Sequence, residues 1–140
     1  MLIPVIDIFA GPGGLSEGFS SLRNSEGKSI FHLCLSIEKD QQAHKTLELR
    51  SFFRQFPDGE APEEYYQYLR NEGITRDHLF SKYKKESEQA RVTAWQFELS
   101  ENNALQIDKR IKEALKGKNE WVLLGGPPCQ AYSLIGKKGY

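Results

Sequence analysis

The sequence predicts an α/β fold, in which helices cover a parallel β-sheet. Short apolar runs rich in β-branched residues occupy 2–9, 31–37 and 121–124, and helical stripes of apolar residues lie between them. Each run ends at glycines or at an acidic residue. Alternation of this kind is typical of strand–helix–strand units. The 140 residues, 39% hydrophobic and 27% charged, suit one domain with one core.

The first half of the chain reads as strand, loop, helix, strand and helix. The run from Leu2 to Phe9, interrupted by Asp7, enters the glycine loop 10–14. Apolar residues at i, i+4 and i+7 then indicate a short helix, and Asp40 is a suitable N-cap for the helix after the second strand. The apolar positions of these two helices are Leu15, Phe19, Leu22, Ala43, Leu47 and Phe53.

The middle of the chain interrupts this rhythm. Residues 54–99 are predicted to form a charged insertion, with helices near 63–71 and 76–90 that are mostly solvent-exposed. The alternation then resumes with a helical stripe at Ala104, Ile107, Ile111 and Leu115, closed by Gly117 at the position after the helix end. Residues 121–124 are predicted to be the third strand.

Composition excludes several classes of protein. Nineteen basic and nineteen acidic residues give zero net charge, whereas a freestanding nucleic-acid-binding module is usually basic. Cys34 and Cys129 are far apart, so the chain is neither a disulfide scaffold nor a cysteine-rich zinc module, and free thiols suit a reducing cytoplasm. No run is long enough to cross a membrane, and the N-terminus does not resemble a signal peptide.

Two features by themselves indicate a nucleotide-like ligand. Gly11, Gly13 and Gly14 let the backbone approach a ligand, although a tight turn without a ligand explains them as well. The dinucleotide pattern GxGxxG would need glycine where Ser16 stands, which weakens an NAD interpretation. Glu38 ends the second strand, where an acid can bind ribose hydroxyls or, alternatively, cap the next helix.

The loop after the predicted third strand carries a candidate nucleophile. Pro127 and Pro128 each fix a φ angle, so this loop is stiff and can hold the side chain of Cys129 in a set direction. Cys129 would lie at the carboxyl end of a parallel strand, where these sheets bind ligands. Cys34, inside the second strand, is expected to be a small buried apolar residue.

Together these segments resemble the DNA cytosine-5 methyltransferase family. Residues 7–19 (DIFAGPGGLSEGF) resemble its first motif, 36–40 (SIEKD) its second, and 125–133 (GGPPCQAYS) its catalytic Pro-Cys motif, with Tyr132 where phenylalanine is common. The resemblance covers both ends of the chain but not 54–99. It implies a Rossmann-like S-adenosylmethionine-dependent methyltransferase fold, of which this chain holds part of the parallel-sheet core.

The resemblance also implies roles for individual residues. Cys129 would be the nucleophile that adds to the cytosine ring, because carbon 5 alone is too poor a nucleophile to take the methyl group. Glu38 would bind the ribose and Lys39 would lie beside the adenine. Other residues of the S-adenosyl-L-methionine pocket would be Phe9, Gly11, Gly14, Leu15 and Pro127, and Gln130 and Ser133 would belong to the substrate loop. The base would have to leave the double-stranded DNA.

The chain also departs from the family pattern. No clear copy of the adenine-reading acid is present, and Glu98 is a candidate for it or, equally, an exposed acid. The Glu-Asn-Val and Arg-x-Arg motifs and the target-recognition domain are missing, so residues 1–140 are expected to be the N-terminal part of a longer enzyme and inactive alone. DNA contacts beyond residue 140 would explain the zero net charge. An NAD-dependent dehydrogenase and a non-catalytic cofactor-binding or interaction module are the alternatives.

Overall fold

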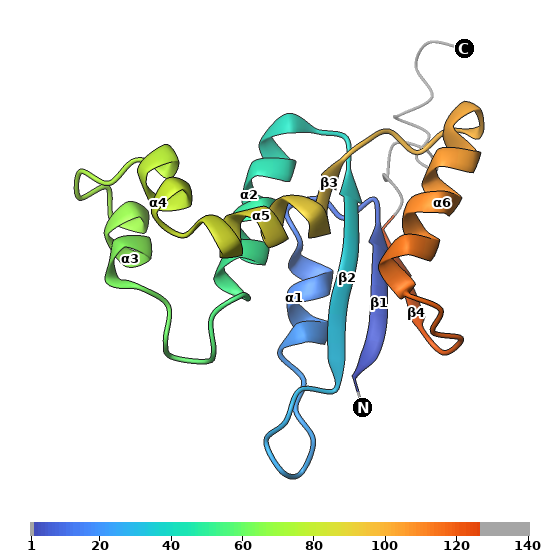
Figure 1. Ribbon diagram of the computed structural model, residues 1–140, viewed down its shortest axis with the longest axis horizontal. Helices are drawn as coiled ribbons and strands as arrows, with labels where there is room; N and C mark the ends of the chain where they lie inside the picture. The colour runs from blue at the N-terminus through green and yellow to red at the C-terminus, as the bar shows by residue number, and fades with distance from the viewer. Residues whose placement is uncertain (1, 127–140) are drawn as a thin grey trace, which may run out of the picture.

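The computed structural model describes residues 2–126. Strands β1 (Ile3–Ile8), β2 (Phe31–Glu38), β3 (Ala94–Gln96) and β4 (Val122–Gly125) alternate with helices (Figure 1). The helices are α1 (Gly14–Ser20), α2 (Gln41–Phe53), α3 (Glu63–Leu69), α4 (Arg76–Lys82), α5 (Lys84–Thr93) and α6 (Ala104–Leu115), with a 3₁₀ turn, η1 (Glu101–Asn103), before α6. Within 2–126, no helix has the length and apolarity needed to cross a membrane.

The four strands form a parallel sheet in the order β3-β2-β1-β4. Helices α1, α2 and α5 cover one face, and α6 covers the other (Figure 1). The chain moves outward from β1 to β3, then crosses to the far side of β1 to form β4. This reversal makes a topological switch point between β1 and β4, as in Rossmann-like folds. The predicted α/β fold class is therefore confirmed.

A bulge in β2 distributes its side chains between the two faces. Val5 pairs with Leu33 and Ile6 pairs with Leu35, so Cys34 is the extra residue. Leu33 consequently packs with Val5 on the α1 side, whereas Leu35 packs with Ile6 on the α6 side. Cys34 is half-buried beside the α6-side cluster, and burial raises the pKa of its thiol. Cys34 thus packs with apolar residues as predicted, but it is only partly buried.

Helix α6 uses only part of its predicted stripe. Ile107 and Leu115 are buried against β1 and β2, and Ile111 packs beside them. Ala104 is exposed, because it begins the helix beyond the edge of the core. The helix ends with Lys116 in the left-handed conformation at φ 51°, followed by Gly117 at φ 78°. Both residues thus have left-handed backbone conformations, and Gly117 is at the predicted position after the helix end.

The helix after the glycine loop is shorter than its apolar spacing suggests. It ends at Ser20, so Leu22 lies outside it and is 48% exposed. Leu15 is 49% exposed, and only Phe19 of the predicted stripe packs into the core, edge-to-face with Phe31. The predicted short helix is therefore present, but Leu22 lies outside it and only Phe19 of the three apolar residues packs into the core.

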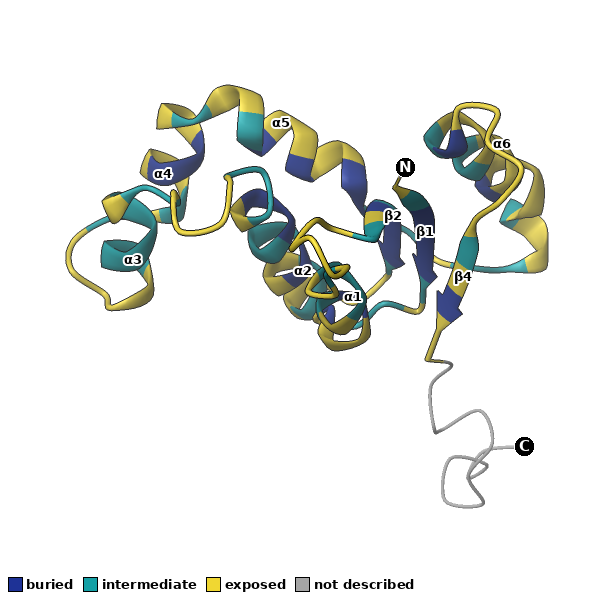
Figure 2. Ribbon diagram, turned by 90° about the horizontal axis from the view of Figure 1, so that it is seen from below, coloured by how far each residue is buried: buried dark blue, intermediate teal, exposed yellow. Residues whose placement is uncertain are grey.

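Segment 54–99 is more buried than predicted. Tyr83 separates α4 from α5, so the expected helix over 76–90 is two helices. Leu79, Phe80 and Ala90 are buried around Phe52 of α2. The ribbon in Figure 2 has dark blue, buried stretches in α4 and α5. Most residues of α4 and α5 are exposed, as expected, but each helix buries one face that the sequence analysis did not predict, whereas α3 contains no buried residue.

The same segment also contains a strand that the sequence analysis did not predict. Strand β3 pairs in parallel with β2, with Ile37 opposite Trp95. Residues 121–124, predicted as the third strand, overlap the fourth, since β4 begins at Val122 and ends at Gly125. Part of segment 54–99 therefore belongs to the sheet.

Candidate functional site

The described candidate residues lie at the carboxyl ends of the four strands, at one edge of the sheet. The glycine loop follows β1, Glu38 is the last residue of β2, Phe97 and Glu98 follow β3, and Gly126 follows β4. Because the strands are parallel, these ends meet beside the switch point between β1 and β4. Residues separated by more than 100 positions in the sequence therefore share one edge.

Glu38 joins two backbone segments at this edge. Its Oε1 accepts a hydrogen bond from the Gly11 N–H at 3.0 Å, and its Oε2 accepts one from the Asp40 N–H at 2.8 Å. Since a carboxylate oxygen has two lone pairs, each oxygen keeps one for a ligand hydroxyl. Asp40 caps α2 through the Ala43 N–H, so Glu38 is not that helix's side-chain cap. Glu38 therefore contacts the glycine loop, and the alternative that its side chain caps α2 is wrong.

The glycine loop folds through conformations that favour glycine. Gly11 has φ 59° and Gly13 has φ 94°, and a Cβ on Gly13 would lie 3.0 Å from Cδ1 of Leu47. Phe9 also has a positive φ, 52°, although it has a side chain. The tight approach of Gly13 to α2 sets the direction in which the loop leaves β1.

Ser16 occupies the position where the dinucleotide pattern has glycine. It is fully buried, and its Oγ donates a hydrogen bond of 3.0 Å to the carbonyl of Gly13. The Glu17 N–H donates to the same carbonyl at 3.0 Å. The loop is therefore held by a serine hydroxyl, which a glycine at position 16 would not supply.

The free side of the loop has room for a ligand. A Cβ added at Gly11, Gly14 or Gly126 would meet no atom within 4 Å. Phe9 and Leu15, on either side of the loop in the sequence, have exposed apolar side chains, 36% and 49% exposed. Open backbone, two exposed apolar side chains and the Glu38 carboxylate fit a ligand with a ribose and an apolar or aromatic part.

A hollow of about 600 Å3 lies between the ends of β2 and β3. It is lined by Lys39, Asp40, Gln41, Gln96, Phe97 and Glu98. Gln96 donates from Nε2 to the Lys39 carbonyl at 3.3 Å, and the Phe97 N–H donates to the Glu38 carbonyl at 3.1 Å. The predicted adenine-side residues Lys39 and Glu98 thus line one hollow, adjacent to Glu38 in the fold.

A second hollow, of about 580 Å3, lies between α1 and the turn after α2. Glu17, Ser51 and Arg54 are among its lining residues, but none of the predicted cofactor-site residues within 2–126 is. The edge with the strand ends is the better candidate site, because the loop and Glu38 converge there.

Sequence reasoning gave no role to Asp7, which lies directly before the loop. It is 1% exposed, and one of its carboxylate oxygens, Oδ2, has no hydrogen-bond partner among residues 2–126. Burial raises the pKa of Asp7, while the neighbouring Ser16 hydroxyl and the charge of Arg54 lower it. The signal in the sequence was an acidic residue inside an otherwise apolar strand.

The predicted residues of the last loop, Pro127, Cys129, Gln130 and Ser133, lie outside the described residues. Glycines 125 and 126 lead to them from β4. A Cβ on Gly125 would lie 3.1 Å from Cγ1 of Ile8, its partner in β1. Glycine at this position therefore allows β4 to pack closely against β1 where the two strands end.

Comparison with known proteins gives one informative match. The chain is 29% identical to the Type II methyltransferase M.Bpa9945I of Bacillus paralicheniformis, over 95% of this chain and 32% of the relative. This similarity supports a methyltransferase family. The chain spans about a third of the length of that relative. No family model matches the chain, and no solved structure matches it.

Proposed function

We propose that this chain is the cofactor-binding part of a DNA (cytosine-5)-methyltransferase. The observation that carries the proposal is the contact of Glu38 with the glycine loop at the carboxyl ends of β1 and β2, beside the strand that leads to Pro127 and Cys129. Similarity to a Type II methyltransferase supports methyl transfer, and the order of the three motifs supports cytosine carbon 5 as the target.

The proposed cofactor is S-adenosylmethionine, which supplies an electrophilic methyl group when bound. Glu38 would accept hydrogen bonds from its ribose hydroxyls, using the lone pairs that Gly11 and Asp40 leave free. Phe9, Gly11, Gly14 and Leu15 would surround the methionine part, and Lys39 and Glu98 would face the adenine. Pro127 would border the pocket near the methyl group. The shape of the loop supports this arrangement, since within residues 2–126 no atom lies within 4 Å of a Cβ added at Gly11 or Gly14.

Cys129 would activate the base. Its thiolate would form a bond from sulfur to carbon 6 of a cytosine turned out of double-stranded DNA, which makes carbon 5 nucleophilic. After carbon 5 has been methylated, loss of its proton to a base and cleavage of the sulfur–carbon 6 bond would release the thiolate. Gln130 and Ser133 would lie along the substrate. An enzyme that methylates an amino group has no need of this thiol, so Cys129 favours carbon 5.

Covalent trapping tests the proposal. The complete protein that carries this chain is incubated with S-adenosylmethionine and duplex DNA containing 5-fluorocytosine, from which carbon 5 cannot lose a proton. We expect a denaturation-resistant adduct that maps to Cys129 by peptide mass spectrometry. The variant Cys129→Ser should form none. Cofactor-dependent methylation of DNA without an adduct would contradict the thiolate route, and binding of the cofactor with no transfer would favour a non-catalytic module.

A further inference from the structure

We propose that Arg54 is a positioning residue for the glycine loop, which it holds through its ion pair with Glu17. Asp7 lies in β1 just before the loop, and Glu17 lies in the first turn of α1 just after it. From the C-terminal end of α2, Arg54 contacts Glu17 directly and places a positive charge near Asp7. The importance of this role for catalysis rests on the proposed cofactor function of the loop.

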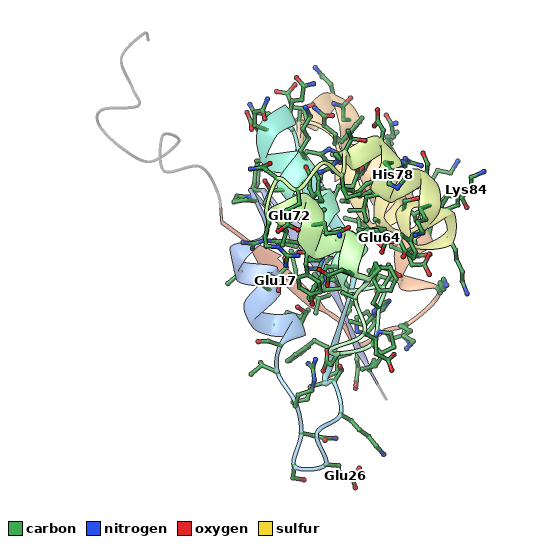
Figure 3. The ribbon with its side chains drawn as sticks, turned by 90° about the vertical axis from the view of Figure 1, so that its left-hand side faces the viewer. Glu17, Glu26, Glu64, Glu72, His78 and Lys84 are labelled. Carbon is green, nitrogen blue, oxygen red and sulfur yellow. The ribbon has the colours of Figure 1, made fainter. Side chains whose placement is uncertain are left out.

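The contact between Arg54 and Glu17 is direct. The Nη1 of Arg54 donates a hydrogen bond of 2.5 Å to Oε1 of Glu17, across 37 positions of sequence. The Arg54 side chain is only 17% exposed and that of Glu17 is 39% exposed. In Figure 3, Glu17 lies on α1, whereas Glu26 lies at the tip of the turn that leads to β2. Because Arg54 and Glu17 are both partly buried, their ion pair is less screened than an ion pair on the surface.

Asp7 is a second acidic neighbour of Arg54. Among residues 2–126, the buried atoms Asp7 Oδ2 and Arg54 Nη2 have no hydrogen-bond partner. One is an acceptor and the other a donor, and the positive charge of Arg54 lowers the pKa of Asp7. Buried polar groups of this kind are commonly bridged by an ordered water. Arg54 thus offsets the charge of an acid that is almost completely buried.

Glu17 is connected to the loop through the carbonyl of Gly13. The backbone N–H of Glu17 donates to this carbonyl, and the Ser16 Oγ donates to it as well. A shift of Glu17 would therefore move the peptide of Gly13. Without Arg54, Glu17 would lose its ion pair, and the buried Asp7 would lose a positive charge that stabilises its carboxylate.

Amide hydrogen exchange at Gly11 and Gly13 measures this effect without any cofactor. Both amides are hydrogen-bonded: that of Gly11 donates to Glu38 Oε1 at the end of β2, and that of Gly13 donates to the Ala10 carbonyl. In the complete protein that carries this chain, we expect Arg54→Met to accelerate their exchange about tenfold, since loosening a loop lowers the free energy of its opening. Adding Asp7→Asn to Arg54→Met should restore most of the protection, because the unpaired buried charge is then gone.

Arg76→Met is the matched control. Arg76 forms an ion pair of 3.0 Å with Glu48 of α2 and has a side-chain exposure of 22%, but it contacts α2 on the side of α4. This variant should lower stability while leaving the exchange of Gly11 and Gly13 unchanged. If Arg54→Met does not fold, Glu17→Gln tests the same link, because it keeps the shape of the pair and removes one charge. It should accelerate exchange by a smaller factor.

The outcomes separate this proposal from the proposed function. Unchanged exchange at both glycines in the Arg54 or Glu17 variant would overturn the positioning role, and so would failure of Asp7→Asn to restore protection. If exchange responds as expected, and S-adenosylmethionine binds the wild type about tenfold more tightly than Arg54→Met, both proposals are supported. If exchange responds but the wild type does not bind S-adenosylmethionine, the positioning role holds and the cofactor assignment fails.

Discussion

Glu38 accepts the backbone N–H of Gly11 at 3.0 Å, although the two residues are 27 positions apart. This contact fixes the loop after β1 against the end of β2, and a second contact fixes the same carboxylate to Asp40 at 2.8 Å. One acid therefore connects the start of the glycine loop with the start of α2. Any ligand that binds Glu38 at the carboxyl edge also meets a loop whose direction Glu38 has set.

Replacement of Glu38 tests this double contact. In Glu38→Gln, the amide nitrogen replaces one acceptor, so one of the two backbone N–H groups loses its partner. A hydrogen bond to a charged group contributes about 1.5–3 kcal/mol. We therefore expect S-adenosylmethionine affinity to fall by tenfold or more in isothermal titration calorimetry. Glu26→Gln, in the exposed turn before β2, is the control and should bind as the wild type does. If Glu38→Gln and Glu26→Gln bind S-adenosylmethionine with equal affinity, Glu38 is not part of the cofactor site.

Two neighbouring glycines should respond differently to alanine. In Gly125→Ala the new methyl group would lie 3.1 Å from Ile8 Cγ1, which forces β4 and β1 apart and should cost about 1–3 kcal/mol of stability. In Gly126→Ala the methyl group meets nothing within 4 Å, so the free energy of unfolding should change by less than about 0.5 kcal/mol. Urea denaturation compares the two variants. A larger loss for Gly126→Ala would contradict the packing of β4 on β1.

Phe52 should couple α2 to the helices of segment 54–99. It is fully buried and stacks on Phe80 with ring centroids 4.8 Å apart. Phe52→Ala should lower the free energy of unfolding by about 3–5 kcal/mol, because it leaves a cavity in the aromatic cluster. The neighbouring Phe53 is 36% exposed, so Phe53→Ala should cost less than half as much. Similar losses in chemical denaturation would mean that the cluster is not a core.

The raised pKa of Asp7 predicts a dependence of stability on pH. Burial is the main cause of the shift, so the folded state holds the Asp7 proton to a higher pH than the unfolded state does. The stability that this proton contributes is complete below the unfolded pKa, near 3.8, and is lost as the pH rises through the higher folded pKa. Asp7→Asn should remove this loss. Its stability relative to the wild type should therefore increase from pH 3.5 towards neutral pH, and a flat difference would contradict the burial of the charged carboxyl.

The sequence predicted the parts of the fold that local patterns determine. The apolar runs placed β1 and β2, Asp40 was correctly predicted to cap α2, and the spacing of Ile107, Ile111 and Leu115 indicated α6. Strand β3 was missed because it has only three residues and follows α5 without a break. Its pairing with β2 is a tertiary contact, which periodicity within so short a segment does not reveal.

Burial in segment 54–99 could not be predicted from local composition. Leu79, Phe80 and Ala90 lie among charged residues, so α4 and α5 looked like exposed helices, but α2 supplies Phe52 as their packing partner. The site showed the same limit. Motifs identified Glu38 and the glycine loop, whereas the contact from Glu38 to Gly11 and the burial of Asp7 depend on how the strands are aligned. Those relationships emerge only after the sheet has formed.

The most direct test of the account is the identity of the methylated base. The complete protein that carries this chain is incubated with isotopically labelled S-adenosylmethionine and duplex DNA, and the DNA is digested to nucleosides for mass spectrometry. The account predicts labelled 5-methyldeoxycytidine, and none with Cys129→Ser. Label in N4-methyldeoxycytidine or N6-methyldeoxyadenosine, or 5-methyldeoxycytidine that persists in Cys129→Ser, would contradict it.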